Sequence, residues 1–252
     1  GLNHNSPGRG PPGPELPFVR AAHRPPATSA VLCGPRPIRA AVRAPAPRAA
    51  TADEISKMCA LLEHALTEGG AGLSTGLIYA PAMYAEPAEI HALAQVVARH
   101  GGIYATHMRS EGGRLLEAID EALEVARATG VRLQVSHLKT AGRANWHKVE
   151  AALEKINSAR AAGVEVASDL YPYTASCTDL DIILPTWAAQ DGRVAILGRL
   201  RDSATRAKIR ADIAAERDEA YWEAVWVGST RHPDNAPFAG QPLTVAAAAW
   251  NI

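Results

Sequence analysis

Strand-like and helix-like segments alternate along much of this sequence with a period of about thirty residues. Short apolar runs typical of strands begin near positions 72, 103, 131 and 164, and each interval between them holds one amphipathic helical pattern. This alternation predicts a parallel β-sheet whose strands are joined by right-handed helical crossovers. A (β/α)8 barrel and a doubly wound sheet both fit the pattern. No glycine-rich nucleotide-binding motif follows any of the predicted strands, so a nucleotide fold has no positive support.

Residues 1–50 differ sharply in composition from the rest of the chain. They hold 11 of the 18 prolines, seven arginines and one acidic residue, which gives them a net charge of about +6 and leaves about −6 for the remainder. A proline-rich segment with so little apolar surface does not offset the entropy lost on ordering. We therefore expect residues 1–50 to be a disordered or partly frame-shifted segment, and residues 51–252 to form an incomplete β/α barrel domain.

The overall composition argues against several classes of protein. Lys plus Arg and Asp plus Glu each number 26, which does not suit a protein that coats nucleic acid or an anionic membrane. No apolar run reaches the roughly 18 residues of a transmembrane helix. The three cysteines are too few and too widely spaced for a disulfide framework, which favours a reducing, cytoplasmic location.

Three successive predicted strands end in residues that can bind a metal, namely His107, His137 and Asp169. In β/α folds, functional side chains collect at the carboxyl ends of the strands. Neighbouring strands lie about 4.8 Å apart, so two imidazoles at the same level can converge on one zinc ion. Zinc would activate water and polarise a carbonyl oxygen, which suits amide or ester hydrolysis. The structural alternative is that the histidines are ordinary satisfied polar groups and that Asp169 is a loop cap.

Four strings carry a resemblance to a known family: GLSTGLIYAP at 72–81, GGIYATHMRSE at 101–111, LQVSHLK at 133–139 and DLYPYTASCTDL at 169–180. Together, and in this order, they resemble the N-acyl-D-amino-acid deacylases (D-aminoacylases) of the amidohydrolase superfamily. The resemblance runs from about residue 31 to at least residue 206. It implies a (β/α)8 barrel with a small β-sandwich domain, and zinc-dependent hydrolysis of N-acyl-D-amino acids to a carboxylate and a D-amino acid.

The resemblance also implies roles for individual residues. His107 and His137 match the family's two zinc-binding histidines, and one or two zinc ions are expected. Lys139 matches a lysine that faces the substrate. The tyrosine that hydrogen-bonds the reacting group matches Tyr171 or Tyr173, and Tyr171 is the favoured choice. Further substrate contacts are expected from Arg109, Ser176 and Tyr79.

The chain also departs from the family pattern. It lacks the HxH pair of the first barrel strand, and Cys33 does not align with the family's metal-bridging cysteine, so we do not assign it to the metal. The catalytic general-base Asp is expected beyond Ile252, and Asp169 belongs to a different motif. The chain therefore looks like an internal fragment with four or five βα units, which are too few to close an eight-stranded barrel.

Three functional interpretations stay open at this point. The first is deacylation of an N-acyl-D-amino acid, with a small-molecule substrate and with neither nucleic acid nor membrane as a partner. The second is a catalytically inactive, truncated remnant that binds metal weakly. The third is another amidohydrolase that acts on cyclic amides. An open barrel edge is an aggregation hazard, so a complementing chain or self-association through that edge is also expected.

Overall fold

The computed structural model describes residues 2–3, 30–42, 48–79, 81–178, 180–230 and 232–250. The chain forms two compact units, Gly1–Pro172 and Tyr173–Ile252. The division between these units falls after Pro172, and the separate division expected at residue 50 stays a prediction. Within the described residues, no helix combines the length and the apolar character needed to cross a membrane.

The first unit is built on a six-stranded parallel sheet whose strands follow one another in sequence order. From one edge to the other, the strands are β1 (Leu2–Asn3), β2 (Val31–Cys33), β3 (Gly72–Gly76), β4 (Ile103–His107), β5 (Arg132–Val135) and β6 (Val166–Ser168). A doubly wound sheet reverses its strand order part-way, whereas a barrel wall does not. The sequential order therefore favours the barrel interpretation.

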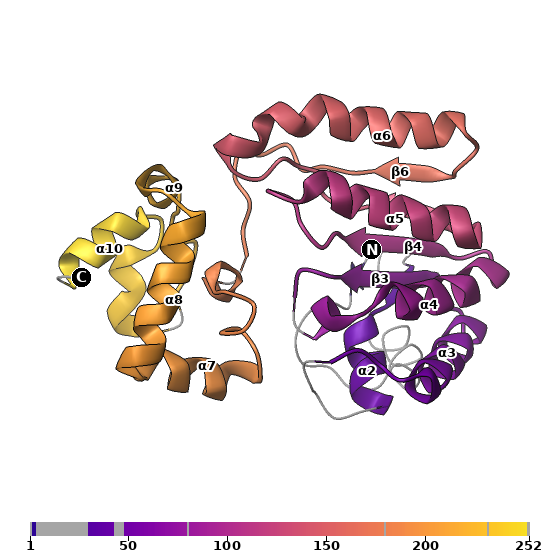
Figure 1. Cartoon of the computed structure of the whole chain (residues 1–252), viewed down its shortest axis with the longest axis horizontal. Coiled ribbons are helices and arrows are strands. Elements are labelled where there is room, and N and C mark those ends of the chain that lie inside the picture. Colours follow the sequence, from indigo (N-terminus) through magenta and orange to yellow (C-terminus); the bar gives the residue numbers. More distant parts are fainter. Residues whose placement is uncertain are drawn as a thin grey trace. The chain divides into compact units, whose positions relative to one another are not determined.

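Helices connect the strands and lie side by side along the sheet (Figure 1). The helices of this unit are α2 (Pro35–Val42), α3 (Ala52–Thr67), α4 (Pro87–Arg99), α5 (Leu115–Thr129) and α6 (Val149–Ala161), with the 3-10 turns η1 (Ala82–Tyr84) and η2 (Arg143–Lys148). A capping box begins α3, because the Thr51 hydroxyl accepts from the Glu54 N–H and the Glu54 carboxylate accepts from the Thr51 N–H. Gly130 ends α5 in the left-handed conformation, with a φ of +70°.

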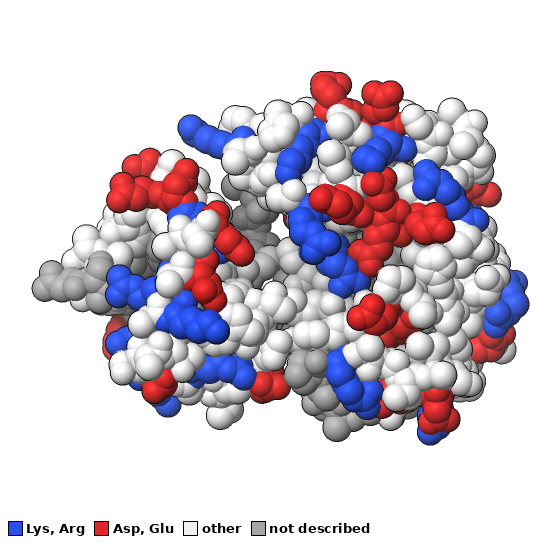
Figure 2. Space-filling view, in the orientation of Figure 1, with Lys and Arg blue, Asp and Glu red and all other residues white. Residues whose placement is uncertain are grey.

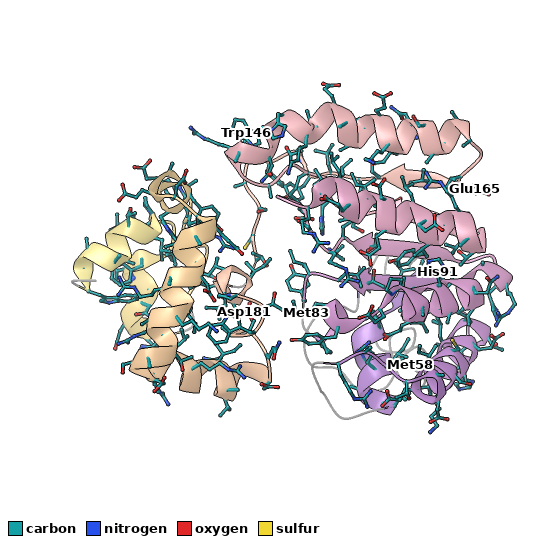
Figure 3. The ribbon with its side chains drawn as sticks, viewed as in Figure 1. Met58, Met83, His91, Trp146, Glu165 and Asp181 are labelled. Atoms are coloured by element: carbon teal, nitrogen blue, oxygen red, sulfur yellow. The ribbon has the colours of Figure 1, made fainter. Side chains whose placement is uncertain are left out.

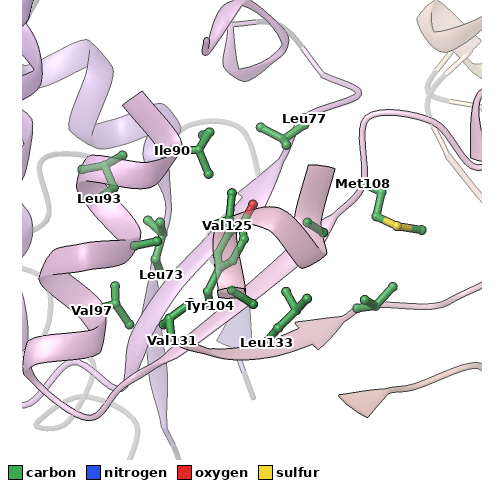
Figure 4. Close-up of a cluster of buried hydrophobic side chains, with 14 of the residues drawn as sticks. Leu73, Leu77, Ile90, Leu93, Val97, Tyr104, Met108, Val125, Val131 and Leu133 are labelled. Atoms are coloured by element: carbon green, nitrogen blue, oxygen red, sulfur yellow. The ribbon is translucent and has the colours of Figure 1, made fainter. Parts of the chain in front are cut away.

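The core of the first unit lies between the sheet and its helices (Figure 4). Tyr104, the second residue of β4, is 1% exposed, and its hydroxyl lies 3.1 Å from the hydroxyl oxygen of Thr75. The Thr75 hydroxyl in turn donates to Thr106 over 2.8 Å. Successive strand residues point to opposite faces of a sheet. Because Tyr104 and Thr106 face the helices, His107 is directed to the other face, which is the interior face of a barrel.

Within the segment expected to be disordered or partly frame-shifted, residues 31–33 form β2 and residues 35–42 form α2. Strand β2 pairs with β3, and helix α2 packs against α3. Ile38 is fully buried, and Arg39 forms an ion pair with Glu89 of α4, with the two side chains 2% and 1% exposed. These long-range contacts stabilise residues 31–42 in a way that the proline-rich composition of the segment does not predict. Residues 4–29 and 43–47 lie outside the described residues.

The second unit is helical in its described part. Its helices are α7 (Gly192–Arg201), α8 (Ser203–Glu216), α9 (Glu219–Glu223) and α10 (Leu243–Ala249), with the 3-10 turns η3 (Leu180–Ile183) and η4 (Pro233–Phe238). Helix α7 packs on α8, and α9 packs on α10. The β-sandwich domain that the resemblance implies is not found among the described residues.

Candidate metal centre

His107 and His137 lie at the carboxyl ends of neighbouring strands. Strand β4 ends at His107, and His137 follows the last residue of β5 by two positions. The Nδ1 atom of His107 contacts the Nε2 atom of His137, and the ring centroids are 4.3 Å apart with an interplanar angle of 51°. The structure thus brings the two histidines predicted as ligands together, with one ring nitrogen of each directed at the other.

The backbone at His137 is held in an unusual conformation by Asp169. His137 has a φ of +40°, in the left-handed region that non-glycine residues rarely adopt. One carboxylate oxygen of Asp169 accepts from the backbone N–H of His137 over 2.7 Å, and the other accepts from the side-chain amide of Gln134 over 2.6 Å. Asp169 therefore caps the loop at His137, which is the structural role considered for it as the alternative to metal binding. Strained backbone of this kind is typical of functional sites.

A lysine and a glutamate complete a polar cluster around His137. The Nζ atom of Lys139 lies 2.7 Å from Nδ1 of His137 and 2.5 Å from Oε1 of Glu111. The same glutamate oxygen lies 2.7 Å from Nδ1 of His137. Sequence reasoning missed Glu111, although it ends one of the motif strings. The available signal was an acidic residue four positions after a strand-terminal histidine, in a loop at the same edge of the sheet.

Burial and hydrogen bonding shift the pKa values of His107 and Glu111. Burial, with a smaller contribution from the neighbouring His137, lowers the pKa of His107 from 6.5 to about 4. Burial raises the pKa of Glu111, but hydrogen bonds with His137 and Lys139 outweigh this effect and hold its pKa below the ordinary value. His107 is therefore neutral near pH 7, and Glu111 is ionised. A neutral imidazole is the form that binds metal ions.

No family model matches the chain. An N-acyl-D-glutamate deacylase of Alcaligenes xylosoxydans xylosoxydans is 44% identical over 170 residues, which are 67% of this chain and 34% of that protein. A D-aminoacylase of the same organism is 40% identical over 152 residues, which are 60% of this chain and 31% of that protein. The resemblance to the N-acyl-D-amino-acid deacylases is confirmed. The chain spans about a third of the length of these relatives.

Solved structures of deacylases support the same relationship. A crystal structure of N-acyl-D-glutamate deacylase from Bordetella bronchiseptica, complexed with zinc and a phosphonate inhibitor, gives a TM-score of 0.70 at 29% identity. The match covers 93% of this chain and 42% of that one. A crystal structure of D-aminoacylase, described as defining a novel subset of amidohydrolases, gives a TM-score of 0.60 at 40% identity over 65% of this chain and 34% of that one. The predicted fold class, a partial barrel of the amidohydrolase kind, is therefore confirmed.

Of four further residues that the resemblance matches to substrate contacts, one lies beside the histidine cluster and the other three are exposed. Tyr171 lies beside the histidine cluster, because Nζ of Lys139 is 5.6 Å from the centroid of its ring. Tyr173 and Ser176 belong to the second unit, and both are exposed. Tyr79 lies in the turn after β3 and is 41% exposed. The substrate contacts of these four residues stay predictions, and the geometry supports the preference for Tyr171.

Arg109 does not join the histidine cluster. Its guanidinium donates to both carboxylate oxygens of Glu121, at distances between 2.8 and 3.3 Å. It also donates to the backbone carbonyls of Met83 and Ala85, at 2.7 and 3.0 Å. These bonds tie the turn after β3 to α5. The Arg109 guanidinium thus forms its hydrogen bonds within the protein, and its geometry does not support the predicted contact with the substrate.

Arg109 instead lines a groove of about 590 Å³ between α4 and α5. Met83 and His91, both labelled in Figure 3, contribute to its walls. Acidic side chains gather over α5 with basic side chains beside them (Figure 2). The acidic residues that line the groove are Glu86, Glu117, Asp120, Glu121 and Glu124. None of the groove residues belongs to the histidine cluster, so the two features are distinct.

Proposed function

We propose that this chain supplies part of the active site of a zinc-dependent hydrolase that cleaves the amide bond of N-acyl-D-amino acids. The observation that carries the proposal is the convergence of Nδ1 of His107 and Nε2 of His137 at the carboxyl ends of neighbouring strands. Imidazole nitrogens are ligands that zinc prefers, so these two side chains fit such an ion as part of its ligand set. The similarity to N-acyl-D-glutamate deacylases, one of them complexed with zinc, supports the choice of metal and substrate.

Bound zinc would polarise the substrate carbonyl and lower the pKa of a bound water. Within this chain, Lys139 offers a positive charge beside the histidines, and its side chain is 20% exposed. We assign it to the carboxylate of the substrate or to the oxyanion that forms during attack. Tyr171 lies next to Lys139 and would donate a hydrogen bond to the reacting group. Asp169 holds His137 in place from the backbone side.

A second candidate function is a metal-binding segment without turnover. Among the described residues, no group of three or more His, Cys, Asp or Glu side chains is arranged to hold a metal ion. A zinc site held by two histidines alone binds weakly, because affinity depends on the complete ligand set and its surroundings. The number of zinc ions bound, one or two, also depends on this ligand set.

A hybrid protein would separate these candidates. The segment of the Alcaligenes N-acyl-D-glutamate deacylase that aligns with this chain would be replaced by the chain's own sequence. The proposal predicts zinc-dependent release of D-glutamate from its N-acetyl derivative, with no release from the L-isomer or from a cyclic amide. His107→Ala and His137→Ala should each reduce turnover more than a hundredfold. A folded hybrid that binds zinc but turns over no substrate would support the metal-binding segment, and a folded hybrid that binds no zinc would overturn both candidates.

We also propose that the sheet edge at β6 associates with a complementing chain or with a second copy. β6 is the last strand of the described sheet, and Ala167 and Ser168 on it are exposed. Unpaired strand edges promote association through backbone hydrogen bonds. Light scattering on the purified chain should show dimers or larger species, and a monomer at all concentrations would refute this part of the proposal.

A further inference from the structure

We infer that Glu111 is a positioning residue that selects the tautomer of His137 in which Nε2 is free to bind a metal. This inference rests on the proposed metal site, and it concerns a residue that the family resemblance did not single out. The observation behind it is a conflict at one atom. Nδ1 of His137 has two close polar neighbours, Oε1 of Glu111 at 2.7 Å and Nζ of Lys139 at 2.7 Å.

The two neighbours demand opposite tautomers of the same ring. A neutral imidazole carries one N–H and one lone pair, and only the nitrogen with the lone pair can bind a metal. If Nδ1 accepts a hydrogen bond from Lys139, the ring proton must sit on Nε2, the nitrogen that faces His107. If Nδ1 instead donates to Glu111, the lone pair is on Nε2. A metal-competent His137 therefore requires the carboxylate, and not the ammonium, as the partner of Nδ1.

Glu111 resolves the conflict by binding both groups with one oxygen. Its Oε1 atom lies 2.5 Å from Nζ of Lys139 as well as 2.7 Å from Nδ1 of His137. A carboxylate oxygen accepts more than one hydrogen bond, so the ammonium and the imidazole N–H can both donate to it. Without Glu111, the ammonium of Lys139 would remain as the nearest polar partner of Nδ1 and would favour the wrong tautomer.

The loop that carries Glu111 is held on several sides before any metal arrives. The Ala141 N–H donates to the Glu111 carbonyl over 2.7 Å, which joins this loop to the one that follows His137. The Ser110 hydroxyl accepts from two backbone N–H groups of the same loop. Lys148 donates to the carbonyl of Gly113 over 2.6 Å. The Glu111 side chain is 18% exposed. A carboxylate fixed in this way orients a metal-binding histidine in advance.

The first test measures zinc affinity of the full chain by competition with a chromophoric chelator. We expect Glu111→Ala to weaken zinc binding about 10- to 100-fold, as is typical when the group behind a metal-bound histidine is lost. Lys139→Met should leave the affinity within about threefold of the parent chain, because Nδ1 keeps its acceptor. The double variant should bind zinc more tightly than Glu111→Ala alone, because the competing donor is gone. Glu117→Gln on α5, outside the histidine cluster, is the control for loss of one acidic charge, and it should leave the affinity unchanged.

A second measurement reads the tautomer without metal. Long-range proton–nitrogen NMR correlations of metal-free chain with labelled histidines should show the proton of His137 on Nδ1, and on Nε2 in Glu111→Ala. An unchanged tautomer, or an unchanged zinc affinity in folded Glu111→Ala, would overturn the inference while leaving the proposed function standing. If the parent chain binds no zinc, the metal site itself fails, and the NMR result still decides the role of Glu111.

Discussion

The buried ion pair between Arg39 of α2 and Glu89 of α4 predicts a large contribution of α2 to the stability of the first unit. The two side chains are 2% and 1% exposed, and Arg39 also donates to the Arg48 carbonyl over 3.1 Å. Replacing Arg39 with Met removes both contacts and leaves the Glu89 carboxylate buried without its cation. Removing one partner of a buried pair costs about 3–5 kcal/mol. Glu89 Oε1 has no hydrogen-bond partner among the described residues, so Glu89 has little to replace the lost cation.

Urea unfolding followed by circular dichroism would measure the effect. We expect Arg39→Met to lower the free energy of unfolding by about 3–5 kcal/mol, and the double variant with Glu89→Met to be less destabilised than the single one. The matched control is Arg99→Met on α4, whose guanidinium pairs with Glu63 over 2.8 Å at 54% exposure. That exposed pair should contribute less than about 1 kcal/mol. A change below about 0.5 kcal/mol for Arg39→Met would refute the reasoning, because it would mean that α2 is not docked.

Three further predictions follow from individual side chains. Burial holds the pKa of His107 near 4 against 6.5 in the unfolded chain, so the unfolded state binds more protons between these values. The free energy of unfolding of the metal-free chain should therefore fall as the pH drops from 6.5 to 4, and urea midpoints that do not change, or that rise, would contradict this. Burial raises the pKa of Cys33 to about 11, so iodoacetamide at pH 8 should modify the exposed Cys177 and not Cys33. Peptide mass spectrometry would measure the labelling of each cysteine. Equal labelling of the two cysteines would contradict this prediction. Arg109→Met should lower the free energy of unfolding by about 1–3 kcal/mol, because it loses the bonds to Glu121 and to two backbone carbonyls. Chelator competition should show an unchanged zinc affinity in this variant. Weaker zinc binding would show that Arg109 contributes to the metal centre.

Local patterns sufficed for the strands β3 to β6 of the first unit. The strands expected to begin near 72, 103, 131 and 164 begin at 72, 103, 132 and 166. Hydrophobic periodicity and glycine stops are properties of short stretches, so they can be read without knowing the fold. The pairing of His107 with His137 could also be anticipated, because neighbouring parallel strands carry their carboxyl ends to one edge of the sheet.

Contacts between distant segments were the part that local patterns could not supply. The order of residues 31–42 depends on a partner in α4, 50 positions away from Arg39. Glu111 acquires its role from Lys139, 28 positions later in the chain. Arg109 lies two residues after a metal-ligand candidate, yet its side chain bonds to Glu121 and to the turn after β3. Sequence spacing gives neither the partner of a side chain nor its direction, so these contacts emerge only in the folded structure.

The central claim is that His107 and His137 together bind a metal ion. Zinc X-ray absorption spectroscopy on the chain loaded with one equivalent of zinc tests this most directly. The account predicts scattering from two imidazole rings, with zinc–nitrogen distances of about 2.0–2.1 Å. It also predicts that His137→Ala removes one ring from the signal. A spectrum dominated by sulfur, or one that is unchanged in His137→Ala, would contradict the claim.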